Sequence, residues 1–272
     1  MTVTSLSEPE ETLDQQPTSH LSYSRINRYL TCPEQYRLYY VESLRLRVPN
    51  ASLVFGSIVH VALAEFFREG VDPAHTLARE WGTVRGVELH YNKRESWEEL
   101  GEKGRKLLQK FLAEEAPKIQ RVYGVEKKFE LAVPSTDLPF IGAVDLIAIV
   151  GGQLTIIDFK TAASDYDDHE TALSDQLTAY WLADPTAERV AYCVFTKTKD
   201  PGIQWHFGKR GPADLQQFLL KLRFVLDDIT AGKFYKRPGK HCRYCDFLPV
   251  CLGDEQKAKE MLVKIGPCNR LA

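Results

Sequence analysis

The chain has 272 residues, of which 44% are hydrophobic and 26% charged, enough for one large domain or two small ones with a hydrophobic core. The net charge of −2 excludes attraction to nucleic acid through overall charge, so any basic contact surface must be local. The sequence has no run of eighteen apolar residues and no signal-peptide pattern at its start, so we expect a cytoplasmic protein without a membrane span.

Helical patterns fill the first part of the chain. Residues 1–20 are polar and acidic and are expected to form a disordered tail. The first helix has Ser22 or Ser24 as its cap and should break at Pro33, and the second should end at Gly70. The expected helices are 22–40, 55–69, 73–81 and 96–115.

After residue 120 the pattern changes to β-branched and apolar runs separated by turn residues. The expected strands are 121–133, 139–150, 153–160, 189–198 and 202–208, and the expected helices are 168–183 and 212–231. This order predicts an α/β fold with a mixed central sheet flanked by helices. The chain is expected to divide into the tail 1–20, a helical part 21–120, a core 121–231 and a cysteine-rich lobe 232–272.

The most informative segment is a pair of apolar strands joined by Gly151 and Gly152, which suit a two-residue hairpin turn. With this turn, the register places Asp145 directly opposite Asp158, with their Cβ atoms roughly 5 Å apart. Lys160 lies two residues after Asp158, so its side chain leaves from the same face. The pattern therefore predicts two acids and a lysine gathered on one face of an apolar sheet.

Two carboxylates facing each other on apolar strands need neutralisation. A divalent cation does this well, because carboxylate oxygens suit Mg²⁺ and Mn²⁺. In the alternative interpretation, one acid is protonated or pairs with Lys160, without any function. A β-bulge that shifts the register by one residue would instead place the two acids on opposite faces.

Two further sets of residues could complete such a site. Gln176 and Tyr180 are four residues apart on an expected helix, so they share one helix face, although this pair alone is typical of an ordinary helix surface. His60 lies among apolar residues, which is typical of a core histidine. The functional alternative is an imidazole ligand that a distant helix brings to the carboxylates.

Together these residues resemble the RecB-like branch of the PD-(D/E)XK nuclease superfamily, which includes cysteine-cluster nucleases of CRISPR adaptation and RecB/AddB-type exonucleases. The family pattern is G-x3-H, G-x2-D, D/E-x-K and Q-x3-Y, in this order. In this chain the four motifs are Gly56 to His60, Gly142 to Asp145, Asp158 to Lys160, and Gln176 to Tyr180. The resemblance covers roughly residues 22–251.

The resemblance implies a PD-(D/E)XK nuclease core with a helical N-terminal part, and a role for each motif residue. Lys160 would orient the attacking water and stabilise developing negative charge, while Gln176 and Tyr180 would shape the site and contact the substrate. The implied ligands of Mg²⁺ or Mn²⁺ are His60, Asp145, Asp158 and the backbone carbonyl of Phe159.

A second metal site is indicated near the C-terminus by a C-x2-C pair followed by a third cysteine. The expected ligands are Cys32, Cys242, Cys245 and Cys251. Four thiolates accept either zinc or a [4Fe–4S] cluster, and the resemblance favours the cluster. Of the remaining cysteines, Cys193 is expected to be a buried thiol in a strand and Cys268 to lie in a loose tail.

The segment 233–245 interleaves basic and aromatic residues, a pattern that suits single-stranded nucleic acid but also an ordinary solvated surface. The sequence and the resemblance together predict a Mg²⁺- or Mn²⁺-dependent DNA nuclease. It is expected to be an exonuclease favouring single strands or free ends, acting in DNA repair, recombination or CRISPR adaptation, with a helicase or integrase as partner. The alternatives are a non-catalytic nucleic-acid-binding or scaffolding module, and a zinc-stabilised interaction protein with incidental carboxylates.

Overall fold

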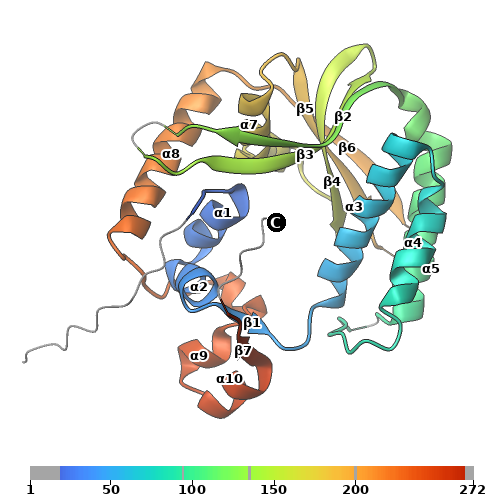
Figure 1. The fold of residues 1–272 in the computed structure, drawn as a ribbon. Helices are drawn as coiled ribbons and strands as arrows, with labels where there is room; N and C mark the ends of the chain where they lie inside the picture. The colour runs from blue at the N-terminus through green and yellow to red at the C-terminus, as the bar shows by residue number, and fades with distance from the viewer. Residues whose placement is uncertain (1–18, 94, 134–135, 199–200, 267–272) are drawn as a thin grey trace, which may run out of the picture.

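The computed structural model describes residues 19–93, 95–133, 136–198 and 201–266, so most of the expected tail 1–20 and Cys268 lie outside the described residues. Its centre is one mixed sheet of five strands in the order β2-β3-β4-β5-β6, with helices on both faces (Figure 1). β4 and β5 run parallel and the other neighbours are antiparallel, which confirms the expected mixed sheet. The strands are β2 (Ile119–Leu131), β3 (Phe140–Val150), β4 (Gln153–Ala162), β5 (Arg189–Thr196) and β6 (Gly202–Gly208).

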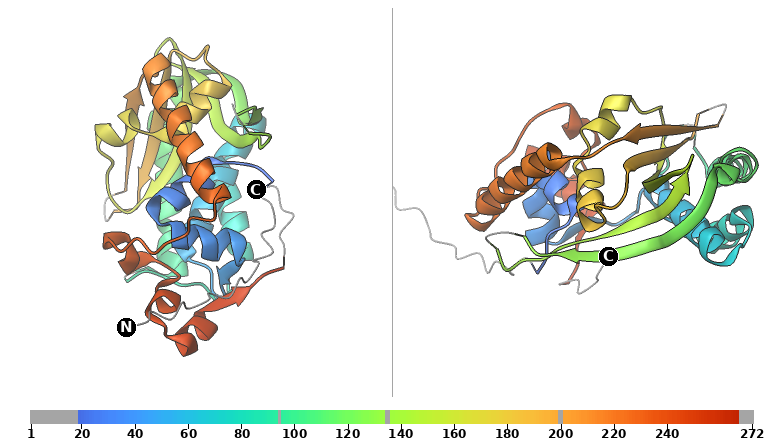
Figure 2. Two further views of the ribbon diagram at one scale, coloured as in Figure 1. Left: turned by 90° about the vertical axis from the view of Figure 1, so that its left-hand side faces the viewer. Right: turned by 90° about the horizontal axis from the view of Figure 1, so that it is seen from above.

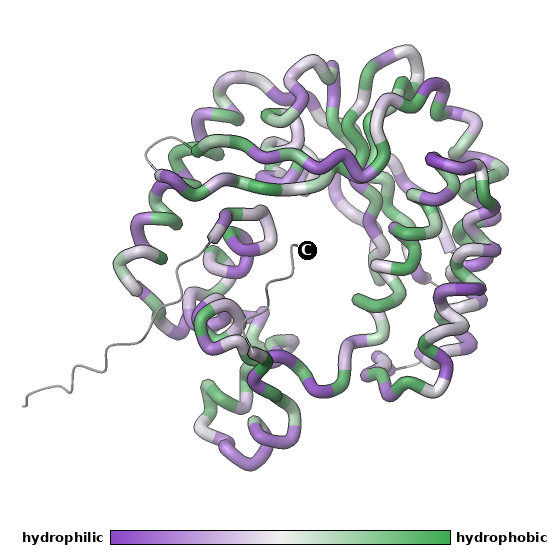
Figure 3. The backbone as a smooth tube through the Cα atoms, viewed as in Figure 1, coloured by the Kyte–Doolittle hydropathy of each residue, from purple (hydrophilic) through white to green (hydrophobic). Residues whose placement is uncertain are grey.

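One face of the sheet is covered by α3 (Ala51–Glu69), α4 (Pro73–Thr83) and α5 (Trp97–Lys110), which η2 (Phe111–Glu115) and η3 (Ala116–Lys118) extend. Phe55 and Leu63 of α3 belong to the same core cluster as Ile157 and Phe159 of β4. Figure 3 shows α3 as mostly hydrophobic, which fits a helix packed against a sheet.

α3 begins four residues earlier than the sequence predicts. The side chain of Asn50 accepts a hydrogen bond from the backbone N–H of Ser52 at 2.8 Å and so caps the helix. Among the described helices, α3 is long and apolar enough to cross a membrane by length and composition. Its buried residues pack in the main core of the domain, as expected for a core helix.

The opposite face carries α6 (Asp168–Ala172), α7 (Asp175–Ala183) and α8 (Pro212–Thr230) (Figure 2). The expected single helix 168–183 is wrong, because the chain breaks at Leu173 and starts again. The Ser174 hydroxyl accepts a hydrogen bond from the N–H of Leu177 at 3.1 Å and caps α7. The break starts a new helix beside β4 and β5, and this helix carries Gln176.

The N-terminal helices lie against the C-terminal lobe (Figure 1). The expected break at Pro33 is confirmed, with Cys32 between the first two helices. The N-terminal elements are α1 (Tyr23–Thr31), α2 (Pro33–Tyr36), η1 (Arg37–Val41) and β1 (Leu44–Leu46); the lobe has η4 (Lys240–Tyr244), α9 (Leu248–Leu252), α10 (Glu255–Met261) and β7 (Leu262–Lys264). β1 pairs with β7, and Leu38 packs with Phe247 and Leu262, so protein contacts join both ends of the fold.

Candidate active site

The hairpin between β3 and β4 forms with the predicted turn. Gly151 and Gly152 both have positive φ, at 58° and 78°, as the turn requires. The paired register runs from the turn to Leu146 opposite Ile157 and stops one step before the two acids. At that point the N–H of Phe159 donates to Oδ2 of Asp145 at 2.8 Å, so a carboxylate takes up a backbone N–H beyond the last described pair.

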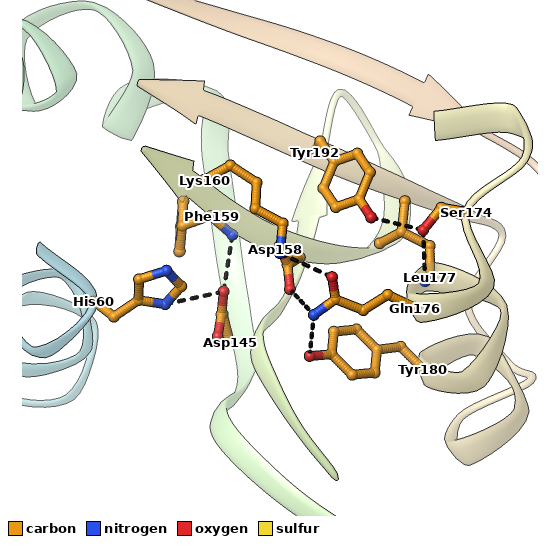
Figure 4. Close-up of polar contacts among 10 residues, drawn as sticks. All are labelled: His60, Asp145, Asp158, Phe159, Lys160, Ser174, Gln176, Leu177, Tyr180 and Tyr192. Carbon is orange, nitrogen blue, oxygen red and sulfur yellow. Dashed lines mark hydrogen bonds and ion pairs between the residues drawn. The ribbon is translucent and has the colours of Figure 1, made fainter. Parts of the chain in front are cut away.

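The site forms where two inner strands of the sheet, β3 and β4, stop pairing with each other. β4 continues alongside β5 as far as Ala162, while its edge toward β3 has no described pairing beyond Ile157. Side chains from both faces reach this opening: His60 comes from α3 and Gln176 from α7 (Figure 4). The fold therefore brings the predicted motif residues together from four elements.

Lys160, Asp158 and Gln176 form one closed polar network. Lys160 Nζ lies 2.6 Å from Oδ2 of Asp158 and donates to Oε1 of Gln176 at 2.8 Å. The amide of Gln176 donates to Oδ1 of Asp158 at 2.9 Å and to the hydroxyl of Tyr180 at 2.8 Å. Gln176 thus holds the acid and the lysine at once, and Tyr180 supports Gln176 (Figure 4).

His60 contacts the other acid. Its Nδ1 lies 3.3 Å from Oδ2 of Asp145, and its side chain is 33% exposed, so it is not a histidine enclosed in the apolar core. Burial lowers the pKa of His60, but the hydrogen bond and charge of Asp145 and the charge of Asp158 outweigh burial and leave this pKa raised. The imidazole is therefore held by the negative charge of the site.

Burial governs the charge of the network. The side chain of Asp158 is 2% exposed, and burial, opposed by the charge of Lys160 and assisted by that of Asp145, raises its pKa to about 6. Burial lowers the pKa of Lys160, but the negative charge of Asp158 more than compensates and leaves this pKa raised. Lys160 therefore stays protonated, and the site combines a fixed cation with a carboxylate whose ionised form is poorly solvated.

Three cavities adjoin the site, and one of them, of about 490 Å³, has Gln176 and Tyr180 in its wall. The other two open on the two sides of β4. A cavity of about 870 Å³ has His60, Gly56 and Thr161 in its wall, and a cavity of about 520 Å³ has Lys160, Gln176 and Tyr192 in its wall. Successive residues of a strand point to opposite faces, so Lys160 and Thr161 open onto different cavities. The larger cavity therefore reaches His60, and the smaller one reaches Lys160 and Gln176.

A model of the PD-(D/E)XK nuclease superfamily matches residues 20–252. The chain belongs to this superfamily. It is similar to the Gene 69 protein of Mycobacterium phage L5, with 25% identity over 291 aligned positions that cover 85% of this chain and 95% of the relative. It is also similar to the crystal structure of a candidate exonuclease from Eubacterium rectale, with a TM-score of 0.52 and 12% identity over 88% of this chain and 94% of that chain, which shows a shared fold.

The residues of this PD-(D/E)XK nuclease fit a hard divalent cation by their chemistry. Two carboxylates and an imidazole supply oxygen and nitrogen donors. Oδ2 of buried Asp158 has Lys160 as an ion-pair partner but makes no hydrogen bond of good geometry to any described residue. Within the described part of the chain, however, no group of three or more His, Cys, Asp or Glu side chains is gathered closely enough to hold a metal, so the ligands would have to move closer on binding.

The cysteines of the expected second site are brought to the same end of the nuclease. Gln35, three residues after Cys32, donates a hydrogen bond to Sγ of Cys245 at 3.5 Å, and burial raises the pKa of Cys245 and of Cys251. Among the described residues, however, no three of these cysteines are gathered closely enough to hold a metal. Cys242 stands apart, because its Sγ accepts a hydrogen bond from the N–H of Gly239 at 3.4 Å. Cys193 is fully buried in the main core, as predicted.

The basic segment 233–245 has a partly structural use. Lys236 donates to the carbonyl of Cys251 at 2.9 Å, and Arg237 donates to the carbonyl of Leu30, so both cations connect parts of the cysteine lobe and its neighbour α1. Tyr244 is 82% exposed and lines the larger cavity beside His60. Lys236 and Arg237 therefore make structural contacts, whereas the ring of Tyr244 lies at the cavity beside His60.

Sequence reasoning missed the tyrosines around Lys160. Tyr23 of α1, Tyr166 before α6 and Tyr192 of β5 all line the cavity of about 520 Å³. They come from three separate segments, and none of them belongs to a motif of fixed spacing. No signal in the sequence alone connects them with Lys160.

Proposed function

We propose that this chain is a Mg²⁺- or Mn²⁺-dependent deoxyribonuclease of the RecB-like branch, an exonuclease that favours single strands or free ends. The observation that carries the proposal is the network of Lys160, Asp158 and Gln176 beside Asp145 and His60, at the open edge of β4. A buried acid paired with a lysine in the wall of a cavity is costly to desolvate, which favours a catalytic role over a scaffold without activity.

The reaction is hydrolysis of a phosphodiester. A water oxygen attacks phosphorus, the bond from phosphorus to the leaving nucleotide oxygen breaks, and that oxygen takes up a proton. Lys160 forms an ion pair with Asp158 at 2.6 Å, so we assign it as a cation that stabilises charge on the phosphate and positions the water. Gln176 fixes its direction through the bond from Nζ to Oε1.

His60, Asp145, Asp158 and the carbonyl of Phe159 would hold the divalent cation. When bound, such an ion lowers the pKa of a water molecule and neutralises negative charge on the phosphate. It would also favour the ionised form of Asp158, which burial alone opposes. The types of donor atom and the poorly solvated carboxylate of Asp158 support this assignment.

For the second site we propose a [4Fe–4S] cluster held by Cys32, Cys242, Cys245 and Cys251, with zinc as the alternative. The contacts of Gln35 with Cys245 and of Lys236 with the carbonyl of Cys251, together with the cysteine spacing, support the ligand set, although the thiols would have to move closer to bind the metal. Cys242 would need to exchange its contact with Gly239 for the metal. Because protein contacts already join the two ends of the fold, the metal would reinforce this junction.

The biological setting is proposed from the resemblance. It comprises action in the cytoplasm, a role in DNA repair, recombination or CRISPR adaptation, and a helicase or integrase as partner. The role and the partner rest on the four motifs and the cysteine spacing together.

The test is cleavage of an end-labelled single-stranded oligonucleotide and its duplex by the full-length protein, with Mg²⁺, with Mn²⁺ and with EDTA. We expect stepwise shortening of the single strand from an end, dependent on either metal. Asp158→Asn protein prepared in parallel controls for contaminating nucleases. Equal cleavage by both proteins, or none by the wild type in either metal, would overturn the proposal.

A further inference from the structure

We infer that the cavity beside Lys160, lined by Tyr23, Tyr166 and Tyr192, binds the base of the unpaired nucleotide next to the bond that is cut. This tyrosine cavity has a volume of about 520 Å³, within the usual range of small-ligand pockets. The inference rests on the proposed function, because Lys160 and Asp158 fix where the cut bond lies.

The cavity has an aromatic corner directly beside the lysine. The rings of Tyr166 and Tyr192 meet edge to face with their centroids 5.7 Å apart, and Lys160 Nζ lies 5.3 Å from the centroid of Tyr192. The hydroxyl of Tyr192 shares a hydrogen bond of 2.6 Å with Ser174, so this ring is held in place. Tyr166 is only half-buried and offers ring surface to the cavity. A phosphate at Lys160 would therefore place the attached base against rings.

The charges around the cavity also suit a nucleotide. Asp175 is neutralised by Lys221 at 2.7 Å, and Glu170 accepts a hydrogen bond from the N–H of Asp167, so the acids in the wall are already engaged. Burial, partly offset by the charge of Lys160, leaves the pKa of Tyr23 and of Tyr166 raised. The rings are therefore neutral at physiological pH, and Lys160 supplies the charge that attracts phosphate.

This assignment gives a physical reason for preferring single strands. A base inside a duplex is paired and stacked, so it must leave the helix before it can enter a cavity. Stacking of bases on aromatic side chains is tolerant of sequence, because every base has a flat face. The tyrosine cavity should thus select unpaired ends without selecting a particular base. The exposed Leu173, 78% accessible at its rim, offers further apolar surface to the sugar and base.

The experiment places the fluorescent base 2-aminopurine at successive positions from each end of a single-stranded oligonucleotide. Binding to the full-length protein is measured in EDTA, and cleavage is measured in Mn²⁺. We expect fluorescence to change sharply at one position near one end, because stacking on a ring quenches this base. Tyr166→Leu, which keeps an apolar side chain but removes the ring, should abolish that change and weaken binding about tenfold. Tyr166→Phe, which keeps the ring, should retain both.

Tyr123→Ala is the matched control, because Tyr123 is a 55% exposed tyrosine on β2 outside the walls of both cavities. Thermal melting verifies that each variant is folded, and Leu173→Asp at the cavity rim gives a second test with little risk to the core. Cleavage by the wild type together with unchanged quenching and affinity in Tyr166→Leu and Leu173→Asp would overturn the cavity assignment alone. Absence of cleavage by the wild type would overturn the proposed function and this inference with it.

Discussion

Nδ1 of His60 lies 3.3 Å from Oδ2 of Asp145, which joins helix α3 to strand β3 at the point where β3 stops pairing with β4. The same oxygen accepts the N–H of Phe159 at 2.8 Å. One carboxylate oxygen therefore connects α3, β3 and β4. The contact of His60 with Asp145 therefore forms where β3 and β4 separate. The variants below test the roles of His60 and of the neighbouring site residues.

His60→Gln should raise the metal concentration required for half-maximal cleavage by about tenfold or more, because a proposed ligand is lost. The melting temperature should change little, since the side chain is 33% exposed and does not fill the core. Metal titrations of activity and thermal melts measure the two effects. His75→Gln on the neighbouring α4, where the histidine is exposed, is the matched control. Unchanged metal dependence with a large loss of stability would favour a purely structural histidine.

The double variant Asp158→Asn/Lys160→Met should lose at least about 100-fold in cleavage rate and be as stable as the wild type or more so. Both buried charges are removed together, so neither is left without its partner. Replacing a buried ion pair with neutral groups commonly leaves stability unchanged or raises it by about 1–4 kcal/mol. Chemical denaturation measures the free energy of unfolding, which should stay the same or rise. Cleavage assays measure the rate, which should fall. A strongly destabilised double variant would indicate that the pair serves the fold.

Gln176→Glu should reduce cleavage by about 100-fold, more than Tyr180→Phe, which should lose less than tenfold. The glutamate cannot donate to Asp158 and adds negative charge 2.9 Å from a buried carboxylate, whereas Tyr180→Phe removes only one hydrogen bond to Gln176. Rates at saturating metal and substrate distinguish the two variants. Equal losses would mean that Gln176 acts only through Tyr180.

Protein purified without air should contain about four irons per chain and the visible absorbance of a cluster. Single serine variants of Cys32, Cys242, Cys245 and Cys251 should each lose most of the iron, whereas Cys193→Ala should keep it, because that thiol is buried in the core. Elemental analysis separates iron from zinc. Zinc in place of iron would retain the ligands and reject the cluster, and full metal content in Cys32→Ser would reject the ligand set.

Lys236→Ala/Arg237→Ala should lower the stability of the cysteine lobe and leave the salt dependence of single-strand binding nearly unchanged. Both side chains already donate to backbone carbonyls within this junction. The exposed pair Lys240 and Arg243 provides the comparison, since each lost phosphate contact lowers the slope of log affinity against log salt by about 0.7. A reduced slope for the Lys236/Arg237 variant would indicate that these two cations contact DNA phosphates.

The sequence predicted those parts of the site that depend on local geometry. Gly151 and Gly152 determined the turn, and the turn determined the register as far as Leu146 and Ile157. It could not predict that pairing would stop there, because the side chain of Asp145 competes for the N–H of Phe159. Such competition is decided by the tertiary surroundings of a single carboxylate.

Other misses have the same origin in contacts between distant segments. Residues 168–183 read as one helix because nothing in their local pattern shows that the hydroxyls of Ser174 and Tyr192 meet at 2.6 Å. β1 and β7 have three residues each and are strands only because they pair with each other. Hydrophobic periodicity needs longer segments than these to predict a strand.

The pairing of β1 with β7 has a consequence for how the chain is made. β1 leaves the ribosome long before β7, and at about 5–20 residues per second the interval is roughly 10–40 s. For most of that time the surfaces of the N-terminal helices that later pack against the C-terminal lobe stay uncovered, and Cys32 has none of its proposed partners until Cys242, Cys245 and Cys251 are made. The order of synthesis thus leaves the first helices without their C-terminal neighbours until almost the whole described chain has been made, and the pairing of β1 with β7 forms last.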